Sequence, residues 1–201
     1  MVMKPDYEGV RAYALAYLEN EIDPALTYHN LSHTRDDVLP AAENLAQHSG
    51  VRDGDLLLLR TAALFHDIGF TRQRVGHEEA GIAIASGVLP GFGYSTGQMD
   101  SIAAMIRATK LPQQPHSLLE ELLADADLAV LGGTNFVERN HQLRDEVATF
   151  EGPVSDVVWY TSQIAFVGSH QYFTAAAHQL LDMRKQDNLA FLKQQLAQVT
   201  R

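Results

Sequence analysis

The chain lacks cysteine, and this absence removes several classes of site at once. None of its 201 residues is cysteine, which excludes a disulfide framework, a thiolate zinc site and a cysteine nucleophile. Long apolar runs are also missing, since no segment approaches the roughly 20 apolar residues of a membrane span. The N-terminal stretch is broken by charge every few residues and has no apolar signal-peptide core. We therefore expect a cytoplasmic protein that does not associate with membranes.

Positive charge is scarce as well. The chain has 15 Lys and Arg against 25 Asp and Glu, which gives a formal net charge of −10. This balance argues against a broad binding surface for duplex nucleic acid or an anionic membrane. A small anionic substrate would then need a locally positive pocket, supplied by a metal ion or a few arginines. The remaining composition, 46% hydrophobic and 20% charged, is that of a globular protein.

Helical periodicity runs through nearly the whole chain, and strand-like alternation is absent. Residues 6–21 carry a one-sided apolar stripe at helical spacing. Gly and Pro residues mark the ends of the next predicted helices, which run from about Ser32 to Gly50 and over 53–67, 77–89, 96–109 and 117–131. The pattern of residues 135–201 predicts three or four more helices. The sequence therefore predicts an all-α fold of roughly nine to ten helices.

Four polar segments interrupt this apolar pattern. They are YHNLSH with His29 and His33, LFHDIGF with His66 and Asp67, GHEEAG with His77 and Glu78, and LADADL with Asp125 and Asp127. Asp67 and Asp127 lie near predicted helix C-termini in apolar surroundings, where a carboxylate is disfavoured. A bound divalent cation would offset both costs.

His33 and His66 complete a mixed nitrogen and oxygen donor set with Asp67 and Asp127. Such a set suits a metal ion with open coordination positions more than a closed structural zinc site. We expect one divalent ion, with Mn, Fe, Co, Mg, Ni and Zn all open. Each segment also has a plainer interpretation: a buried His66–Asp67 hydrogen bond, a solvated or supporting Asp125, and an acidic helix start at Glu78. The order of the segments favours the metal site.

That order resembles the HD superfamily of metal-dependent phosphohydrolases, whose signature is His, then His-Asp, then Asp. The match runs from about residue 28 to 133. YHNLSH followed by AALFHDIGF is also similar to the beginning of cyclic-nucleotide phosphodiesterase sites, and GHEEAGIAIASGVLP resembles the third-histidine helix of the HD-GYP branch. The resemblance implies a single HD domain over residues 1–201. Its metal-binding core would span 28–133, and the C-terminal helices, 135–201, would pack on that core or cover it.

The resemblance also implies hydrolysis of a phosphate ester in a small, nucleotide-like substrate by a metal-activated water. Asp67 would bind the metal and accept a proton from that water. His29 would be the general acid, by analogy with the phosphodiesterase YHN motif, or would support a ligand. His77, Glu78 and Asp125 are candidates for a second metal site or for substrate contact. The candidate phosphate clamps, which an anionic substrate needs in so acidic a chain, are Arg72, Arg74, Arg107 and Lys110.

Two other classes of function stay open. The first is an HD-type dinuclear iron oxygenase, which needs further histidine ligands where SIAAMIRATK offers Arg107-Ala108-Thr109. The second is a non-catalytic sensor that binds a nucleotide or a metal. The aromatic residues of the C-terminal third suit a helical core or a lid in which His170 or Tyr172 touches substrate. A homodimer formed through an apolar helix face is also compatible with the pattern.

Overall fold

The computed structural model describes residues 4–201, and its regular elements over that range are all helical. The α-helices are α1 (Tyr7–Glu21), α2 (Leu39–His48), α3 (Asp53–Phe65), α4 (His77–Val88), α5 (Thr96–Ala108), α6 (Leu118–Asp127), α7 (Phe136–Glu151), α8 (Asp156–Ser169) and α9 (Ala175–Val199). A π-helix, η1 (His33–Val38), precedes α2, and three 3₁₀ turns complete the set: η2 (Ile68–Thr71), η3 (Leu89–Phe92) and η4 (Ala129–Gly132). The predicted all-α fold class is confirmed.

Two helices end earlier than predicted, and both ends carry site residues. Helix α3 stops at Phe65, so His66 is its C-cap and Asp67 lies in the turn that follows. Helix α6 stops at Asp127 rather than at 131, because Leu128 leaves the helical region with φ −98° and ψ 14°. The hydroxyl of Tyr172 donates to the carbonyl of Leu128 at 3.3 Å. Tertiary contacts thus override the apolar pattern that predicted a longer helix.

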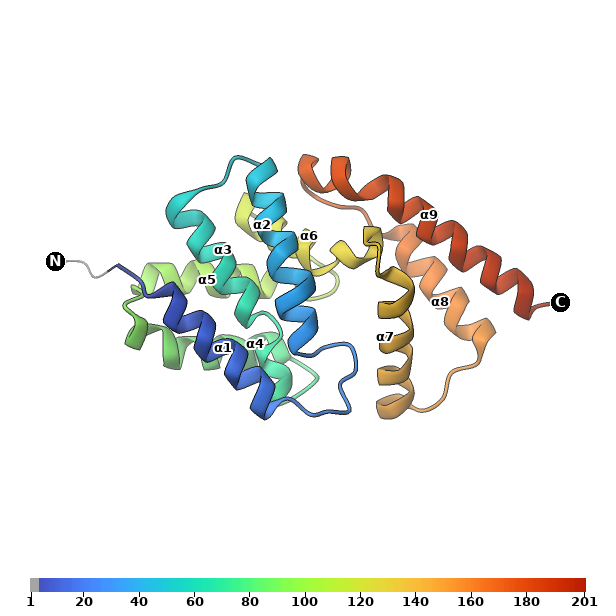
Figure 1. The fold of residues 1–201 in the computed structure, drawn as a ribbon, viewed down its shortest axis with the longest axis horizontal. Coiled ribbons are helices and arrows are strands. Elements are labelled where there is room, and N and C mark those ends of the chain that lie inside the picture. Colours follow the sequence, from blue (N-terminus) through green and yellow to red (C-terminus); the bar gives the residue numbers. More distant parts are fainter. Residues whose placement is uncertain (1–3) are drawn as a thin grey trace.

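The buried side chains form two clusters, and α9 contributes to both, with Ala176 and Ala177 in the larger one and Leu189 and Leu192 in the smaller one (Figure 1). The larger cluster joins α1 to α6 and includes Phe65 and Ile106. The smaller cluster joins η4, α7, α8 and α9, and it contains Tyr28 from the loop between α1 and η1. In Figure 1, α7, α8 and α9 lie together on one side of the molecule, away from α1 and α3. The loop that carries His29 therefore lies where the two clusters meet.

Gly69, in the LFHDIGF segment, allows the closest approach near the site. A Cβ atom there would lie 1.8 Å from the carbonyl oxygen of His77 and 2.6 Å from the amide nitrogen of Gly81. Since neither backbone atom can move away like a flexible side chain, only glycine fits where η2 packs on α4. This packing brings the start of α4, with His77, next to Asp67.

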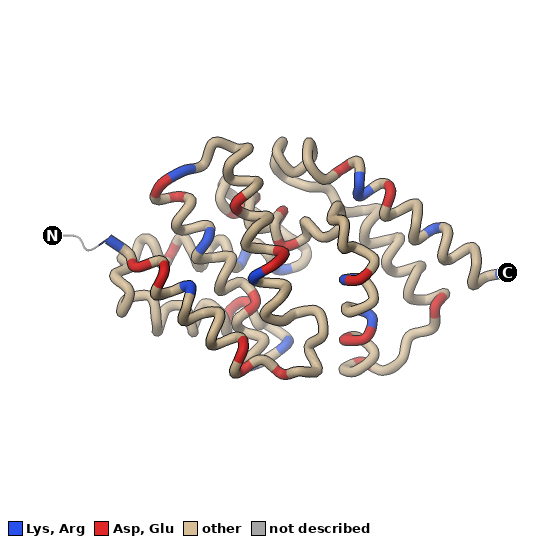
Figure 2. Tube along the Cα trace, viewed as in Figure 1, with Lys and Arg blue, Asp and Glu red and all other residues tan. Residues whose placement is uncertain are grey.

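Acidic and basic residues are interspersed along the helices in both parts of the molecule (Figure 2). In that view, Lys and Arg do not gather along any one helix, so no local block of positive charge offsets their scarcity in the sequence. Within residues 4–201, none of the helices combines the length and apolarity that crossing a membrane would take.

Asp125 fastens the C-terminal helices to the core. Its buried carboxylate accepts hydrogen bonds from the amide nitrogens of Phe173 and Thr174, at 2.8 and 2.9 Å, and from the Thr174 hydroxyl at 2.7 Å. Thr174 in turn caps α9 by accepting from the amide of Ala177. One carboxylate at the end of α6 thus positions the start of α9.

Replacing Asp125 by alanine is expected to lower the free energy of unfolding by about 3 kcal/mol, because three donors lose their buried acceptor. Urea denaturation of the metal-free protein measures this change. Asp187→Ala, on the exposed side of α9, serves as the control and should change stability by less than about 0.5 kcal/mol. A loss below about 1 kcal/mol for Asp125→Ala would contradict this account of the tether.

Candidate metal centre and active site

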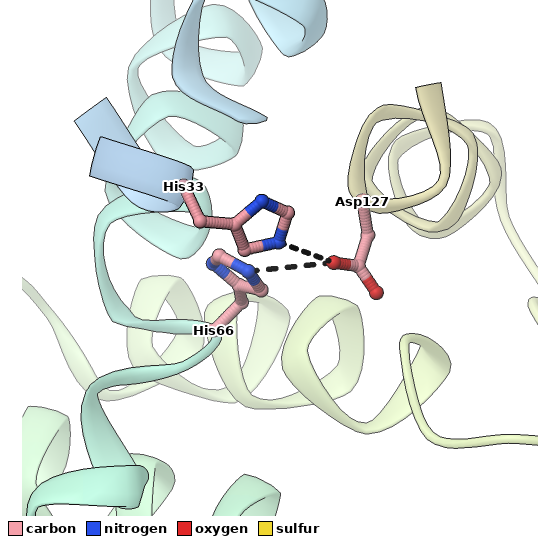
Figure 3. A group of neighbouring side chains, drawn as sticks. All are labelled: His33, His66 and Asp127. Atoms are coloured by element: carbon pink, nitrogen blue, oxygen red, sulfur yellow. Dashed lines mark hydrogen bonds and ion pairs between the residues drawn. The ribbon is translucent and has the colours of Figure 1, made fainter. Parts of the chain in front are cut away.

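Three of the predicted metal ligands meet at one point (Figure 3). His33 comes from the first residue of η1, His66 from the end of α3, and Asp127 from the last residue of α6. The Nε2 atoms of both histidines lie 3.4 Å from Oδ1 of Asp127. One donor atom from each residue lies within 4.8 Å of the others, which is compatible with ligands of one ion.

Asp67 closes the same group from the turn after α3. Its Oδ2 atom lies 3.2 Å from Nε2 of His66 and 3.8 Å from Nε2 of His33. Its Oδ1 atom faces Nε2 of His77 at 3.4 Å. The structure therefore brings His33, His66, Asp67 and Asp127 together, with His77 beside them.

The backbone fixes how two of the rings present their nitrogens. Nδ1 of His66 donates to the carbonyl of Ala63 at 2.8 Å, and Nδ1 of His77 donates to the carbonyl of Arg74 at 3.0 Å. Because Nδ1 donates to the backbone, Nε2 is the atom that faces the carboxylates. In the neutral ring the lone pair then lies on Nε2, which is the tautomer that a metal-binding imidazole requires.

The electrostatics of the group favour a positive charge between its members. Burial alone would lower the pKa of His66, but the Asp67 and Asp127 carboxylates outweigh it and hold this pKa well above its usual value. Burial would raise the pKa of Asp67, yet His66 and His77 bring it well below its ordinary range. Burial would also raise the pKa of Asp127, but its hydrogen bonds with His33 and His66 lower it. Both carboxylates therefore favour their charged form, which stabilises a cation at this position.

Two buried atoms in this group have no hydrogen-bond partner among the described residues, Nε2 of His66 and Oδ2 of Asp67. An unpaired buried polar atom costs about 1–3 kcal/mol. Both atoms belong to predicted ligands and lie 3.2 Å apart, so a single cation would satisfy both lone pairs. The two nitrogen and two oxygen donors thus fit a divalent metal ion, and this donor set does not select one metal.

A family model described as the HD domain matches residues 31–129. All four convergent ligands lie inside this match. The chain belongs to the HD superfamily. The family is one of metal-dependent hydrolases, which agrees with the donor set found here.

Solved structures share the fold of this HD protein over nearly its whole length. A predicted HD superfamily hydrolase from an uncultured Thermotogales bacterium is 23% identical, with a TM-score of 0.65, and the match covers 96% of this chain and 93% of that one. A Lactobacillus plantarum protein is 18% identical, with a TM-score of 0.72 and coverage of 100% and 99%. Bacillus subtilis YpgQ, solved in complex with ADP, is 19% identical, with a TM-score of 0.66 and coverage of 94% and 92%. At these identities the likeness establishes the fold. A comparison with curated proteins gave no match.

Asp37 supports the HD ligand His33 from one helical turn further along. Its Oδ2 lies 3.4 Å from Nδ1 of His33 and 2.6 Å from the guanidinium of Arg139, and its Oδ1 accepts from Asn135 at 2.9 Å. A carboxylate on the far nitrogen orients a metal-binding ring and raises its basicity. Asp37 was not among the predicted site residues, although its spacing of four from His33 is a signal for such contact.

Replacing Asp37 by asparagine is expected to weaken metal affinity about 10- to 100-fold, because His33 loses the negative partner of its Nδ1 atom. Titration of the metal-free protein with Mn²⁺ measures the change. Asp36→Asn is a matched control, since Asp36 is exposed and pairs only with Arg35 on the surface. Equal affinities for the two variants would show that Asp37 has no part in holding the metal.

His29 lies just outside the ligand group, in the loop before η1 rather than on the helix. Its Nδ1 atom is 2.5 Å from Oε1 of Glu146, while Oε2 of Glu146 accepts from the amides of Tyr28 and His29 at 2.8 and 3.0 Å. Burial would raise the pKa of Glu146, but the contact with His29 outweighs it and lowers the pKa. Glu146 therefore favours its carboxylate form and holds His29 in place through three contacts.

Phe70 links this pair to the metal ligands. Its ring stacks on His29 with centroids 4.5 Å apart and on His77 with centroids 4.0 Å apart. On the other side of the loop, Oδ1 of Asn30 accepts from the amides of Ser32 and His33 at 2.9 and 3.3 Å. These contacts set His29 and His33 in fixed positions relative to each other.

The predicted phosphate clamps have other partners. The guanidinium of Arg72 donates to the Tyr17 hydroxyl, that of Arg74 to Glu151, and that of Arg107 makes two bonds to Glu79. Lys110 is exposed. None of these four contacts involves a metal ligand, so clamping would require the side chains to exchange partners.

Of the remaining predicted site residues, one lies near the predicted ligands and three do not. Glu78 is buried, with Oε1 3.9 Å from Nε2 of His77, and stays near the ligands. Asp125 is not brought into the group, because its carboxylate is used to hold Phe173 and Thr174. Tyr172 is buried, and His170 binds Lys185, so neither residue is placed against the ligands.

Proposed function

We propose that this HD protein is a metal-dependent phosphohydrolase that cleaves a phosphate ester in a nucleotide or a nucleotide-like small molecule. The observation that carries the proposal is the convergence of His33, His66, Asp67 and Asp127 around two unpartnered buried atoms. The acid-base pair formed by His29 and Glu146 lies beside them. Metal donors next to a positioned acid are what ester hydrolysis requires.

The four ligands would hold the metal ion. When bound, a divalent cation supplies Lewis acidity that activates water and polarises a phosphoryl oxygen. The carboxylate of Asp67 is ionised at neutral pH and can accept the proton that the attacking water loses. His77, whose Nε2 faces Asp67, would contact the phosphate from the same side.

His29 would donate a proton to the leaving oxygen. Its Nδ1 proton is engaged by Glu146, which leaves Nε2 to carry the transferred proton. The Glu146 carboxylate accepts from Nδ1 and keeps the ring in one orientation. Glu146 is thus a positioning residue that acts through His29.

One structural neighbour supports a nucleotide as the class of substrate. The YpgQ structure holds ADP, and its fold matches this chain over 94% of its length. A nucleotide would place its phosphate at the metal ligands and its base further into the protein.

Metal content and hydrolysis test the proposal. Elemental mass spectrometry of protein purified without chelator should give about one equivalent of divalent metal. Protein reconstituted with Mn, Fe, Co, Mg, Ni or Zn should then hydrolyse a nucleoside mono-, cyclic or triphosphate. Mono- and triphosphates would release phosphate or pyrophosphate, and a cyclic nucleotide would give the ring-opened monophosphate. Failure of every metal to bind would overturn the proposal. One bound equivalent without hydrolysis would favour a sensor, and two equivalents of iron would favour an oxygenase.

A further inference from the structure

A cavity of about 200 Å³ adjoins the catalytic side chains. Tyr28 and His29 line it from the loop, and Leu128, which directly follows the ligand Asp127, lines it from the core. Apolar side chains of η4, α7 and α8 form most of the remaining wall, together with the amides of Asn140 and Gln163. The cavity thus runs from the proposed acid toward the C-terminal helices.

A chain of hydrogen bonds fixes the orientation of these two amides. The indole nitrogen of Trp159, which can only donate, bonds to Oδ1 of Asn140 at 3.0 Å. Nδ2 of Asn140 must then be the donor to Oε1 of Gln163, at 2.7 Å. Trp159 and Asn140 are both buried, so this order is held in place. Oε1 of Gln163 is engaged by Asn140, whereas its Nε2 amide, which offers two donors, has no hydrogen-bond partner among residues 4–201.

Arg139, the one Lys or Arg among the described lining residues, is not free to bind an anionic group of a ligand. The guanidinium of Arg139 is used by Asp37, Ser32 and Gln142, at 2.6, 2.8 and 2.8 Å. A volume of about 200 Å³ is also below the roughly 300–1,000 Å³ of pockets that hold a whole ligand. The cavity therefore suits an uncharged, apolar part of a larger ligand, with one edge that accepts hydrogen bonds.

We propose that this cavity binds the base of the substrate and that Gln163 selects bases with a carbonyl oxygen at the bound edge. The proposal rests on the phosphohydrolase function for the position of the phosphate. A carbonyl oxygen would pair with the Nε2 donors of Gln163, whereas an amino group at the same edge would bring donors face to face and leave them unpaired. Buried donors left unpaired by the wrong ligand are an effective basis for discrimination.

Equilibrium binding can test this selection without turnover. The Mn²⁺-loaded protein would be titrated calorimetrically with non-hydrolysable 5′-phosphonate analogues of inosine and adenosine monophosphate, of uridine and cytidine monophosphate, and of base-free ribose 5-phosphate. Each base-carrying ligand should bind at least about tenfold more tightly than the base-free one. Within each pair, the base with a carbonyl at the varied position (O6 of inosine, O4 of uridine) should bind about tenfold more tightly than the base with an amino group there, as expected for one unpaired donor.

Gln163→Glu supplies the decisive variant. It retains an oxygen for Asn140 but replaces the Nε2 donors by an acceptor, so the preference for carbonyl-bearing bases should disappear or reverse. Affinity for the base-free analogue should stay within about twofold of the unsubstituted protein. Gln163→Met, close in size and without either polar group, should also lose the preference, and Gln194→Glu on the exposed face of α9 should keep it.

Equal affinity for base-carrying and base-free ligands would overturn the inference, as would a carbonyl preference that survives Gln163→Glu. A phosphate-release assay on the same protein separates this inference from the proposed function. Base-dependent binding without hydrolysis supports the cavity and contradicts the phosphohydrolase. Hydrolysis that does not depend on the base or on Gln163 contradicts the cavity and supports the phosphohydrolase.

Discussion

Asp67→Ala is expected to abolish metal binding and turnover together. Asp67 is the one residue that contacts both sides of the site, with Oδ2 toward His66 and His33 and Oδ1 toward His77. Its removal takes away a predicted ligand and the predicted proton acceptor. It also leaves His66 buried beside one carboxylate instead of two, which weakens the attraction for any cation.

The expected size of this effect is large. Metal content should fall from about one equivalent to near zero, and activity should fall at least about a thousandfold, since Lewis-acid stabilisation contributes several kcal/mol. Elemental analysis and a phosphate-release assay on the same preparation measure both. Asp100→Ala, an exposed substitution on α5, is the control for loss of a carboxylate and should retain both properties. An Asp67→Ala protein that keeps its metal would show that Asp67 is not a ligand.

The convergence of the predicted ligands could be anticipated because three of the four violate a local rule, and His33 completes the His, His-Asp, Asp order. An ionisable residue in an apolar segment, or a carboxylate at the negative end of a helix, needs a compensating partner. His66, Asp67 and Asp127 all stood out in this way, and the structure brings them together. Helix positions were also predictable from apolar periodicity. The helix ends next to the site were less so, because contacts such as that between Tyr172 and Leu128 decide where α6 stops.

The supporting residues were not predictable in the same way. Glu146 lies 117 residues from His29 in the sequence, and it sits in an ordinary polar stretch of a helix where a glutamate needs no explanation. Asn140 and Gln163 are equally ordinary until the direction of the Trp159 bond is known. Arg107 shows the converse, because its charge suggested a phosphate clamp while the structure gives it a surface pair with Glu79. Long-range pairing of exposed-type residues leaves no periodic signal in the sequence.

The support for the metal site extends beyond the HD family match. That match ends at residue 129, yet α7 supplies Arg139, which binds Asp37, and Glu146, which binds His29. The first of these contacts supports the predicted ligand His33 through Asp37, and the second positions the proposed acid. Helix α7 therefore belongs to the proposed site in physical terms, and it also forms a wall of the cavity beside His29.

His29→Ala is expected to separate metal binding from catalysis, unlike Asp67→Ala. The His29 ring does not contact the four ligands directly through a hydrogen bond, and its partner is Glu146. Metal content should therefore stay at about one equivalent. Activity on an ester with a poorly acidic leaving alcohol should fall about 10²- to 10⁴-fold, the usual contribution of a general acid.

The leaving group distinguishes an acid from a residue that merely maintains the structure. An ester of p-nitrophenol needs little protonation as it departs, so His29→Ala should lose less than about tenfold on that substrate. Glu146→Gln should follow the same pattern more weakly, because it acts only through the orientation and charge of His29. His141→Ala, exposed on α7, is the matched control and should change neither rate. Equal losses on both esters would indicate damage to the site as a whole, and full activity on the alkyl ester would show that His29 is not the proton donor.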